Sequence, residues 1–207
     1  MEISIARALT ELKTLDSRIQ NKIGGTNFIA GVKKSSKKVN NIYTRDEFNT
    51  DVVANYQSIV DLIKRRKVIK SAIVNSNAIT KVTIADIEYT VADAIERKNS
   101  IELDKTLLIQ LESQYRNVIT SVDRNNEAVE QNLQNLLTAS VGADKKASND
   151  TTLFAEAYRN QNSFEVVNPL KLQEKIEVLR KEIEDFETEV DVILTESNVI
   201  TKIEIED

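Results

Sequence analysis

The chain has no cysteine, histidine or tryptophan, and only one proline and four glycines in 207 residues. Without cysteine or histidine it has no disulfide, no zinc site of the usual kind, no cysteine nucleophile and no imidazole for acid–base catalysis. One proline and 5% aromatic residues also argue against an all-β fold, which needs many turns. We therefore predict no catalytic residue, no metal and no cofactor, and we do not expect an enzyme.

Long hydrophobic runs are missing as well. No stretch approaches the roughly 18 consecutive apolar residues of a transmembrane helix, and residues 1–5 lack the basic start of a signal peptide. These features predict a soluble, cytoplasmic protein. A surplus of Ile, Asn and Lys suggests an AT-rich coding genome, such as that of a low-GC bacterium or its phage.

What the sequence does contain is patterned for long helices. Apolar residues recur at alternating spacings of three and four residues within 3–23, 44–77, 90–137 and 168–197, which predicts four long helices. The fold class is therefore mainly α, with long antiparallel helices in a coiled-coil bundle and small β elements at one end. We expect a single helical domain over residues 1–207.

The ends of the predicted helices carry capping signals. Thr44 and Glu47 form a capping box, and Thr90 is followed by an acid three residues later. Asn168 and Pro169 suit the cap and the first position of the last helix. That helix has the clearest coiled-coil seam of the chain, formed by Leu172, Ile176, Leu179, Ile183, Phe186, Val190 and Ile193.

Two segments interrupt the helices. Residues 24–44 contain short β-prone runs on either side of a lysine-rich stretch, 33–38, which predicts an inserted hairpin with a basic tip. Residues 138–151 predict a mobile loop, followed by a short helix over 152–160.

The length of the third predicted helix raises the question of assembly. About 48 residues at 1.5 Å each would span roughly 70 Å, which is too long for a compact monomer of this mass. Either the helix breaks near Asn125 and Asn126, or the molecule is elongated, or it assembles. Together with the seam of the last helix, this length predicts a homo-oligomer, either a dimer or a higher symmetric assembly.

One sequence motif is repeated. Residues 76–84 match residues 197–205, and both copies end a long helix and enter a short strand. We interpret the repeat as two helix-to-strand corners that pair as a two-stranded sheet at one end of the bundle.

The order of elements resembles a family of small bacterial helical proteins often labelled septicolysin. The resemblance is carried by Asn75-Ser76-Asn77, by the helix start at 90–97, by the extended stretch 164–167 and by the corner Ser197-Asn198. It implies an oligomeric helical bundle and no specific activity. This chain departs from the family pattern because it lacks a tryptophan at the last corner and carries the basic insertion.

Basic residues form the first candidate site. Between residues 33 and 70 the chain has ten basic and four acidic residues, whereas residues 169–207 have five basic and twelve acidic residues. Arg65 and Arg66 could hold an anionic ligand. Alternatively, this basic face complements the acidic C-terminal helix within the bundle or across an oligomer. Nucleic acid is not the expected partner, because no aromatic residues or nucleic-acid motif accompany the charges.

Two further groups could recognise a polar ligand. At the start of the third helix, Tyr89 could stack on a base while Arg97 and Lys98 bind a phosphate. Beside the predicted loop, the ring of Tyr158 and the guanidinium of Arg159 are followed in sequence by three side-chain amides, at residues 160–162. The full set of candidate ligand-binding residues is Tyr89, Arg97, Lys98, Arg65, Arg66, Tyr158, Arg159 and Asn77.

Three functions follow from these observations. The preferred one is a non-enzymatic homo-oligomer that holds a small anionic ligand at its interfaces, for example a phage anti-defence protein that sequesters a nucleotide-derived immune signal. The alternative is a structural or assembly protein, such as a scaffold or chaperone, that acts through its helical surface. The third is an enzyme using carboxylates or a metal, which the absence of histidine and cysteine disfavours.

Overall fold

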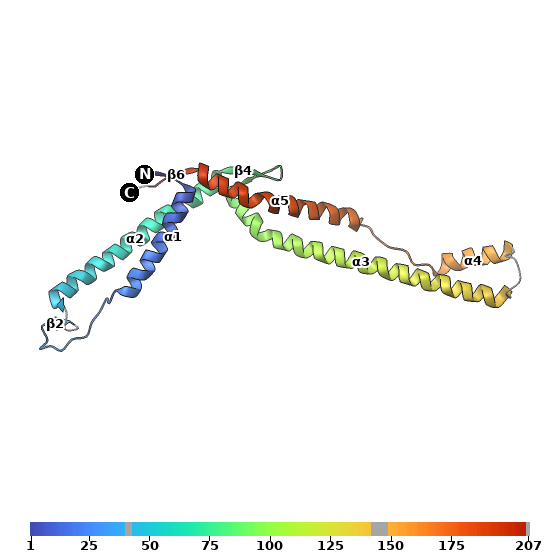
Figure 1. Ribbon diagram of the computed structural model, residues 1–207, viewed down its shortest axis with the longest axis horizontal. Coiled ribbons are helices and arrows are strands. Elements are labelled where there is room, and N and C mark those ends of the chain that lie inside the picture. Colours follow the sequence, from blue (N-terminus) through green and yellow to red (C-terminus); the bar gives the residue numbers. More distant parts are fainter. Residues whose placement is uncertain (40–42, 142–148, 206–207) are drawn as a thin grey trace. The chain divides into compact units, whose positions relative to one another are not determined.

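The computed structural model describes residues 1–39, 43–141 and 149–205. The fold is mainly α, as predicted, with small antiparallel strand pairs (Figure 1). By its internal contacts the chain divides into two compact units. Unit 1 comprises Met1–Asn99 and Asp185–Asp207, and unit 2 comprises Ser100–Glu184.

Five helices make up most of the described residues. They are α1 (Ile5–Gly25), α2 (Arg45–Ile79), α3 (Val91–Val141), α4 (Asn149–Asn162) and α5 (Leu172–Ile200). Six short strands form three antiparallel pairs: β1 (Glu2–Ser4) with β6 (Lys202–Glu204), β2 (Lys38–Val39) with β3 (Tyr43–Thr44), and β4 (Lys81–Ile84) with β5 (Ile87–Thr90).

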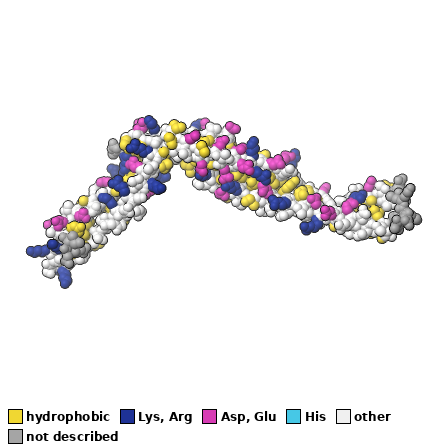
Figure 2. All heavy atoms as spheres, viewed as in Figure 1, with side chains coloured by type: hydrophobic (Ala, Val, Ile, Leu, Met, Phe, Trp, Pro, Cys, Tyr) yellow, Lys and Arg dark blue, Asp and Glu magenta, His cyan; other side chains and the backbone are white. Residues whose placement is uncertain are grey.

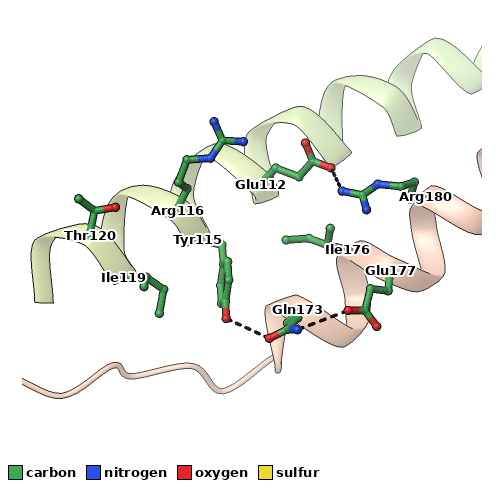
Figure 3. A pocket seen from close by; sticks show the side chains of 9 residues that line it. All are labelled: Glu112, Tyr115, Arg116, Ile119, Thr120, Gln173, Ile176, Glu177 and Arg180. Atoms are coloured by element: carbon green, nitrogen blue, oxygen red, sulfur yellow. Dashed lines mark hydrogen bonds and ion pairs between the residues drawn. The ribbon is translucent and has the colours of Figure 1, made fainter. Parts of the chain in front are cut away.

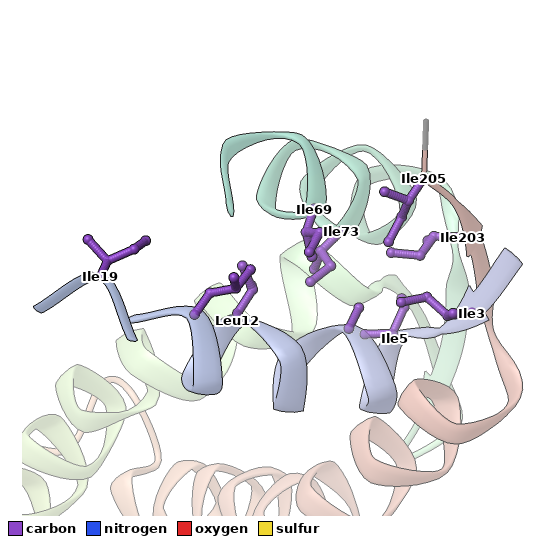
Figure 4. Packing of buried hydrophobic residues seen from close by; sticks show 10 residues of the cluster. Ile3, Ile5, Leu12, Ile19, Ile69, Ile73, Ile203 and Ile205 are labelled. Atoms are coloured by element: carbon purple, nitrogen blue, oxygen red, sulfur yellow. The ribbon is translucent and has the colours of Figure 1, made fainter. Parts of the chain in front are cut away.

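The main core of unit 1 lies where α1 packs along α2. The predicted stripe of α1 is buried and meets Ile69 and Ile73 of α2, and Ile203 and Ile205 close the cluster at the end where β6 follows α5 (Figure 4). Ile69 is 0% exposed. Fully burying an isoleucine side chain contributes about 1.5–3 kcal/mol, so this cluster is the main apolar stabilisation of the helix pair.

The sequence repeat has the same backbone geometry in both copies. At the first corner the Thr80 amide donates to the Ser76 carbonyl, and at the second the Thr201 amide donates to the Ser197 carbonyl, both at 2.9 Å. Each threonine carbonyl then accepts the first amide of another helix: Val91 donates to Thr80 at 2.8 Å, and Ile5 donates to Thr201 at 3.0 Å. The prediction of two helix-to-strand corners is therefore confirmed.

The predicted pairing of the two corner strands with each other is wrong. β4 pairs with β5, and β6 pairs with β1. The partner strands form a second match, because residues 2–8 (Glu-Ile-Ser-Ile-Ala-Arg-Ala) align with residues 88–94 (Glu-Tyr-Thr-Val-Ala-Asp-Ala). Unit 1 thus contains two copies of one motif, in which the end of one helix leads through two paired strands to the start of another. The first copy consists of α2, β4, β5 and α3, and the second of α5, β6, β1 and α1.

A tight turn joins β4 and β5. It consists of Ala85 and Asp86 alone, and both have positive φ, 49° and 62°, so that β5 begins at Ile87. Positive φ at both central residues is the type I′ geometry that matches the twist of a tight hairpin. The Ala85 amide donates to the Glu189 carboxylate at 2.7 Å, which holds the turn against α5.

Two predicted boundaries need correction in the insertion and the last helix. Residues 27–32 form no strand, and the lysine-rich stretch leads into β2, whose first residue is Lys38, instead of forming the tip between β2 and β3. The last helix begins at Leu172, not at Pro169, because the chain first makes a turn in which the Asn168 side chain accepts the Leu172 amide at 2.9 Å. The capping box of Thr44 and Glu47 is confirmed.

The third helix does not break. α3 runs without interruption for 51 residues, or about 76 Å at 1.5 Å per residue, so a break near Asn125 and Asn126, the first of the three alternatives, is wrong. Instead, the Asn126 side chain donates to the Phe164 carbonyl at 3.0 Å and accepts its amide at 2.8 Å, which fixes the extended chain to α3. Of the predicted loop 138–151, residues 138–141 and 149–151 are helical, and the remainder lies outside the described residues.

The α1–α2 core provides a test of the fold. We expect Ile69→Ala to lower the free energy of unfolding by about 3 kcal/mol, because it leaves a cavity among fully buried side chains. Val53→Ala, on the same helix but 68% exposed, should change stability by less than about 0.5 kcal/mol. Chemical denaturation of the full chain, followed by circular dichroism, measures both, and equal effects would contradict this packing.

Candidate functional site

Arg65 and Arg66 project from α2 toward α1. Arg65 Nε lies 3.2 Å from Glu11, and Arg66 forms a bidentate pair with Asp16. The hydrogen bond from Arg66 is the main reason that the pKa of Asp16 lies below its ordinary value of 3.8. Both arginines therefore have an acidic partner on α1.

Tyr89, Arg97 and Lys98 gather where the start of α3 meets α5. The Tyr89 ring packs edge-on against Phe186 with centroids 5.9 Å apart, and the Arg97 guanidinium lies 5.8 Å from the centroid of the same ring. Lys98 forms an ion pair with Asp191. A cation near an aromatic face contributes about 0.5–1 kcal/mol at an exposed site, so these residues have a clear structural role in joining the two helices.

Tyr158 and Arg159 lie on α4, and Arg159 reaches α3. Arg159 donates to both carboxylate oxygens of Glu130, at 2.6 and 3.0 Å, and this hydrogen bonding lowers the pKa of Glu130 below its ordinary value of 4.5. Tyr158 lies beside Phe154, with ring centroids 6.3 Å apart. The Arg159–Glu130 pair ties α4 to α3, whereas the two aromatic rings pack within α4.

Asn77 lies in the last turn of α2, at the first corner. Its side-chain oxygen is buried and has no hydrogen-bond partner among the described residues. Of the eight predicted site residues, the fold places Tyr89 and Arg97 against Phe186 and pairs Lys98 with Asp191 on the same helix. It pairs Arg65 and Arg66 with α1 and Arg159 with α3, whereas Tyr158 contacts Phe154 within α4 and Asn77 lies at the corner.

A cleft that the sequence does not predict lies along one edge of the α3–α5 pair in unit 2. It has a volume of about 550 Å³, and Figure 3 shows its lining side chains on the two facing helices. Tyr115 donates to the Gln173 side chain at 3.1 Å, and Arg180 pairs with Glu112 at 2.5 Å. The lining residues are Glu112, Tyr115, Arg116, Ile119, Thr120, Gln173, Ile176, Glu177 and Arg180.

The chemistry of this cleft is balanced in charge. Each helix contributes one arginine and one glutamate to the lining, beside Ile119 and Ile176, and Arg180 is already paired with Glu112. Arg116 forms no ion pair within the described part of the chain. Such a cleft suits a polar ligand of low net charge better than a multiply charged anion. Glu112 and Glu177 would repel each additional negative charge on the ligand.

The opposite edge of the same helix pair is apolar. A hollow of about 400 Å³, called here the apolar groove, is lined by Leu107 and Leu111 of α3 and by residues at the start of α5 and just before it. Those residues are Leu170, Leu172, Lys175, Val178, Leu179 and Glu182. The sequence indicates the seam side of α5 but not this edge, because the groove depends on how α3 and α5 lie together.

Metal sites and membrane-spanning helices are both missing from the residues that the structure describes. They contain no group of three or more acidic residues placed to hold a metal ion. None of their helices is long and apolar enough to cross a membrane. Comparison of the chain with protein-family models, curated proteins and solved structures finds no match, so the function must be argued from geometry.

The pair of Arg159 and Glu130 can be tested directly. We expect Arg159→Gln to raise the pKa of the Glu130 carboxyl toward 4.5, because the variant removes the donor that lowers it. Since the folded-state pKa is lowered, the pair stabilises the protein above the ordinary pKa, and this contribution is lost as the pH falls through the folded-state pKa. NMR titration of the carboxyl carbon measures the shift.

Arg116→Gln is the matched control, because Arg116 has no carboxylate partner among the described residues. It should leave the Glu130 pKa unchanged. A Glu130 pKa that is the same in Arg159→Gln and in the wild type would show that the ion pair does not form in solution.

Proposed function

We propose that this protein is a non-enzymatic, homo-oligomeric assembly protein that acts through its helical surface. The observation that carries the proposal is the distribution of apolar side chains in unit 2. Among the residues between 100 and 184 whose side chains the structure describes, twelve large hydrophobic side chains are exposed and six hydrophobic residues are buried. A unit that exposes more apolar side chains than it buries has surface available for association.

Most of the coiled-coil seam of α5 does not supply this surface. Ile176, Ile183, Phe186 and Val190 are buried within the chain, whereas Leu172 and Leu179 are half-buried. The seam is one of two sequence arguments for self-association, beside the length of the third helix, and its four buried members are not available to a second copy. Further support comes from exposed residues on both helices, such as Leu103 of α3 at 75% and Val178 of α5 at 55% exposure. Covering each of these would contribute about 1.5–3 kcal/mol.

The charges also favour assembly over sequestration of an anion. A ligand phosphate bound by Arg66 or Arg159 would have to compete with Asp16 or Glu130 for the guanidinium. Figure 2 shows basic and acidic side chains interspersed along the visible face, with hydrophobic side chains between them. Mixed charge of this kind keeps a surface soluble without attracting one class of anion.

A small-ligand function is the second candidate, and one observation favours it. The cleft beside Tyr115 combines an apolar floor with Arg116, which has no ion-pair partner among the described residues. A singly charged ligand with a planar apolar part would fit this chemistry. Under either proposal we infer a cytoplasmic protein from a bacterium or its phage, as the composition predicts.

Self-association of the full chain tests the assembly proposal. We expect sedimentation equilibrium to give an average mass above 23.4 kDa that rises with protein concentration toward a multiple of this value. Because association through apolar surface depends little on ionic strength, the mass should persist in about 1 M salt, where exposed charge pairs are screened.

Arg66→Gln serves as a control, because it removes a cation of the predicted anion site without changing exposed apolar surface. It should leave the mass unchanged. A mass of 23.4 kDa at every concentration would contradict the assembly proposal.

A further inference from the structure

We propose that the apolar groove is the interface at which a second copy of this chain docks, with a two-fold axis passing beside Val178 and Leu179 of α5. This inference rests on the proposed self-association and identifies its surface. The two α5 helices would run antiparallel across the axis, so that each copy covers the groove of the other.

The composition of the groove is that of an interface core. Its lining is dominated by leucine and valine, and Leu107, Leu170 and Val178 are about half exposed or more. Interface cores are depleted in charge and rich in apolar contacts, whereas an ordinary solvated helix face carries charge.

The exposed face of α3 next to the groove extends this pattern. Over three turns of helix it carries no charged side chain, and Leu103 adds apolar surface one turn before Leu107. The charged residues of the same segment, among them Asp104, Lys105 and Glu112, lie on other faces of the helix. The neutral face consists of Leu103, Thr106, Leu107, Gln110, Ser113 and Gln114.

The charges on α5 identify the occupant as a second copy. Lys175 and Glu182 are the two charged residues of α5 that line the groove. They are seven residues apart, about 10.5 Å along the helix, which is too far for a direct ion pair with each other. Within the described residues neither side chain forms an ion pair.

A two-fold axis would give both Lys175 and Glu182 a partner of opposite charge. Val178 and Leu179 are the midpoint between Lys175 and Glu182, so an antiparallel copy places Glu182 of the partner subunit opposite Lys175, and the reverse pair forms on the other side. The groove is therefore complementary to itself in charge as well as in apolar character. An unrelated helix would need the matching charges at the matching spacing, which this chain supplies by symmetry.

A charge-reversal series tests the inference. We expect Lys175→Glu alone, or Glu182→Lys alone, to weaken dimerisation about tenfold, because each places like charges opposite each other at both symmetry-related positions. The double variant, Lys175→Glu with Glu182→Lys, should restore the wild-type dimer. Sedimentation equilibrium of the full chain measures the dissociation constants, with circular dichroism as the check on folding.

The absence of native cysteine allows a second, independent measurement. In the variant Val178→Cys the two introduced thiols lie beside the axis, so a short bismaleimide should cross-link the chain into a covalent dimer. Glu177→Cys is the control, because Glu177 lines the cleft on the opposite edge of the helix pair. It should give little cross-linked dimer under the same conditions.

The outcomes separate the two proposals. If the wild type is a dimer but the charge reversals have no effect and the Val178→Cys variant does not cross-link, the groove inference is overturned and self-association stands. If single reversals weaken the dimer and the double variant does not recover it, the pairing of Lys175 with Glu182 is wrong. If the chain is monomeric and the Val178→Cys variant cross-links to a different protein in cells, both proposals fail and the occupant is a heterologous partner.

Discussion

The hydrogen bond from a helix's first amide to a threonine carbonyl at a corner is the constraint on which unit 1 depends. A helix leaves its first amides without partners, and here Val91 donates to Thr80 while Ile5 donates to Thr201. Each bond fixes where one helix ends and another begins. Because α2 leads to α3 through one corner and α5 meets α1 through the other, two uses of the same corner determine which helix ends lie together.

Much of the mainly α fold can be predicted from the sequence, because long helices with one apolar face leave a clear period. The stripe from Ile5 to Ile19, the capping box at Thr44 and the repeated corners all have local causes. Strands β1 and β5 are not predicted, because they have only three and four residues and their apolar side chains continue directly into the stripe of the next helix.

The candidate sites are harder to predict, because a charge in a sequence does not reveal its partner. Arg65, Arg66 and Arg159 are candidate ligand-binding residues by sequence, and the fold pairs them with Glu11, Asp16 and Glu130. The cleft and the apolar groove depend on how α3 and α5 lie side by side, which the period of each helix does not fix. Four members of the seam that predicts self-association are buried within the chain, so the surface proposed for association combines the half-buried Leu172 and Leu179 with residues outside the seam.

The central claim is that the helical surface, and not a retained small molecule, is the working part of this protein. Native mass spectrometry of the protein purified gently from cells tests it most directly, because it reports subunit number and bound small molecules together. We expect a mass that is a whole multiple of 23.4 kDa without an adduct. A monomer that releases a stoichiometric nucleotide on denaturation would contradict the claim.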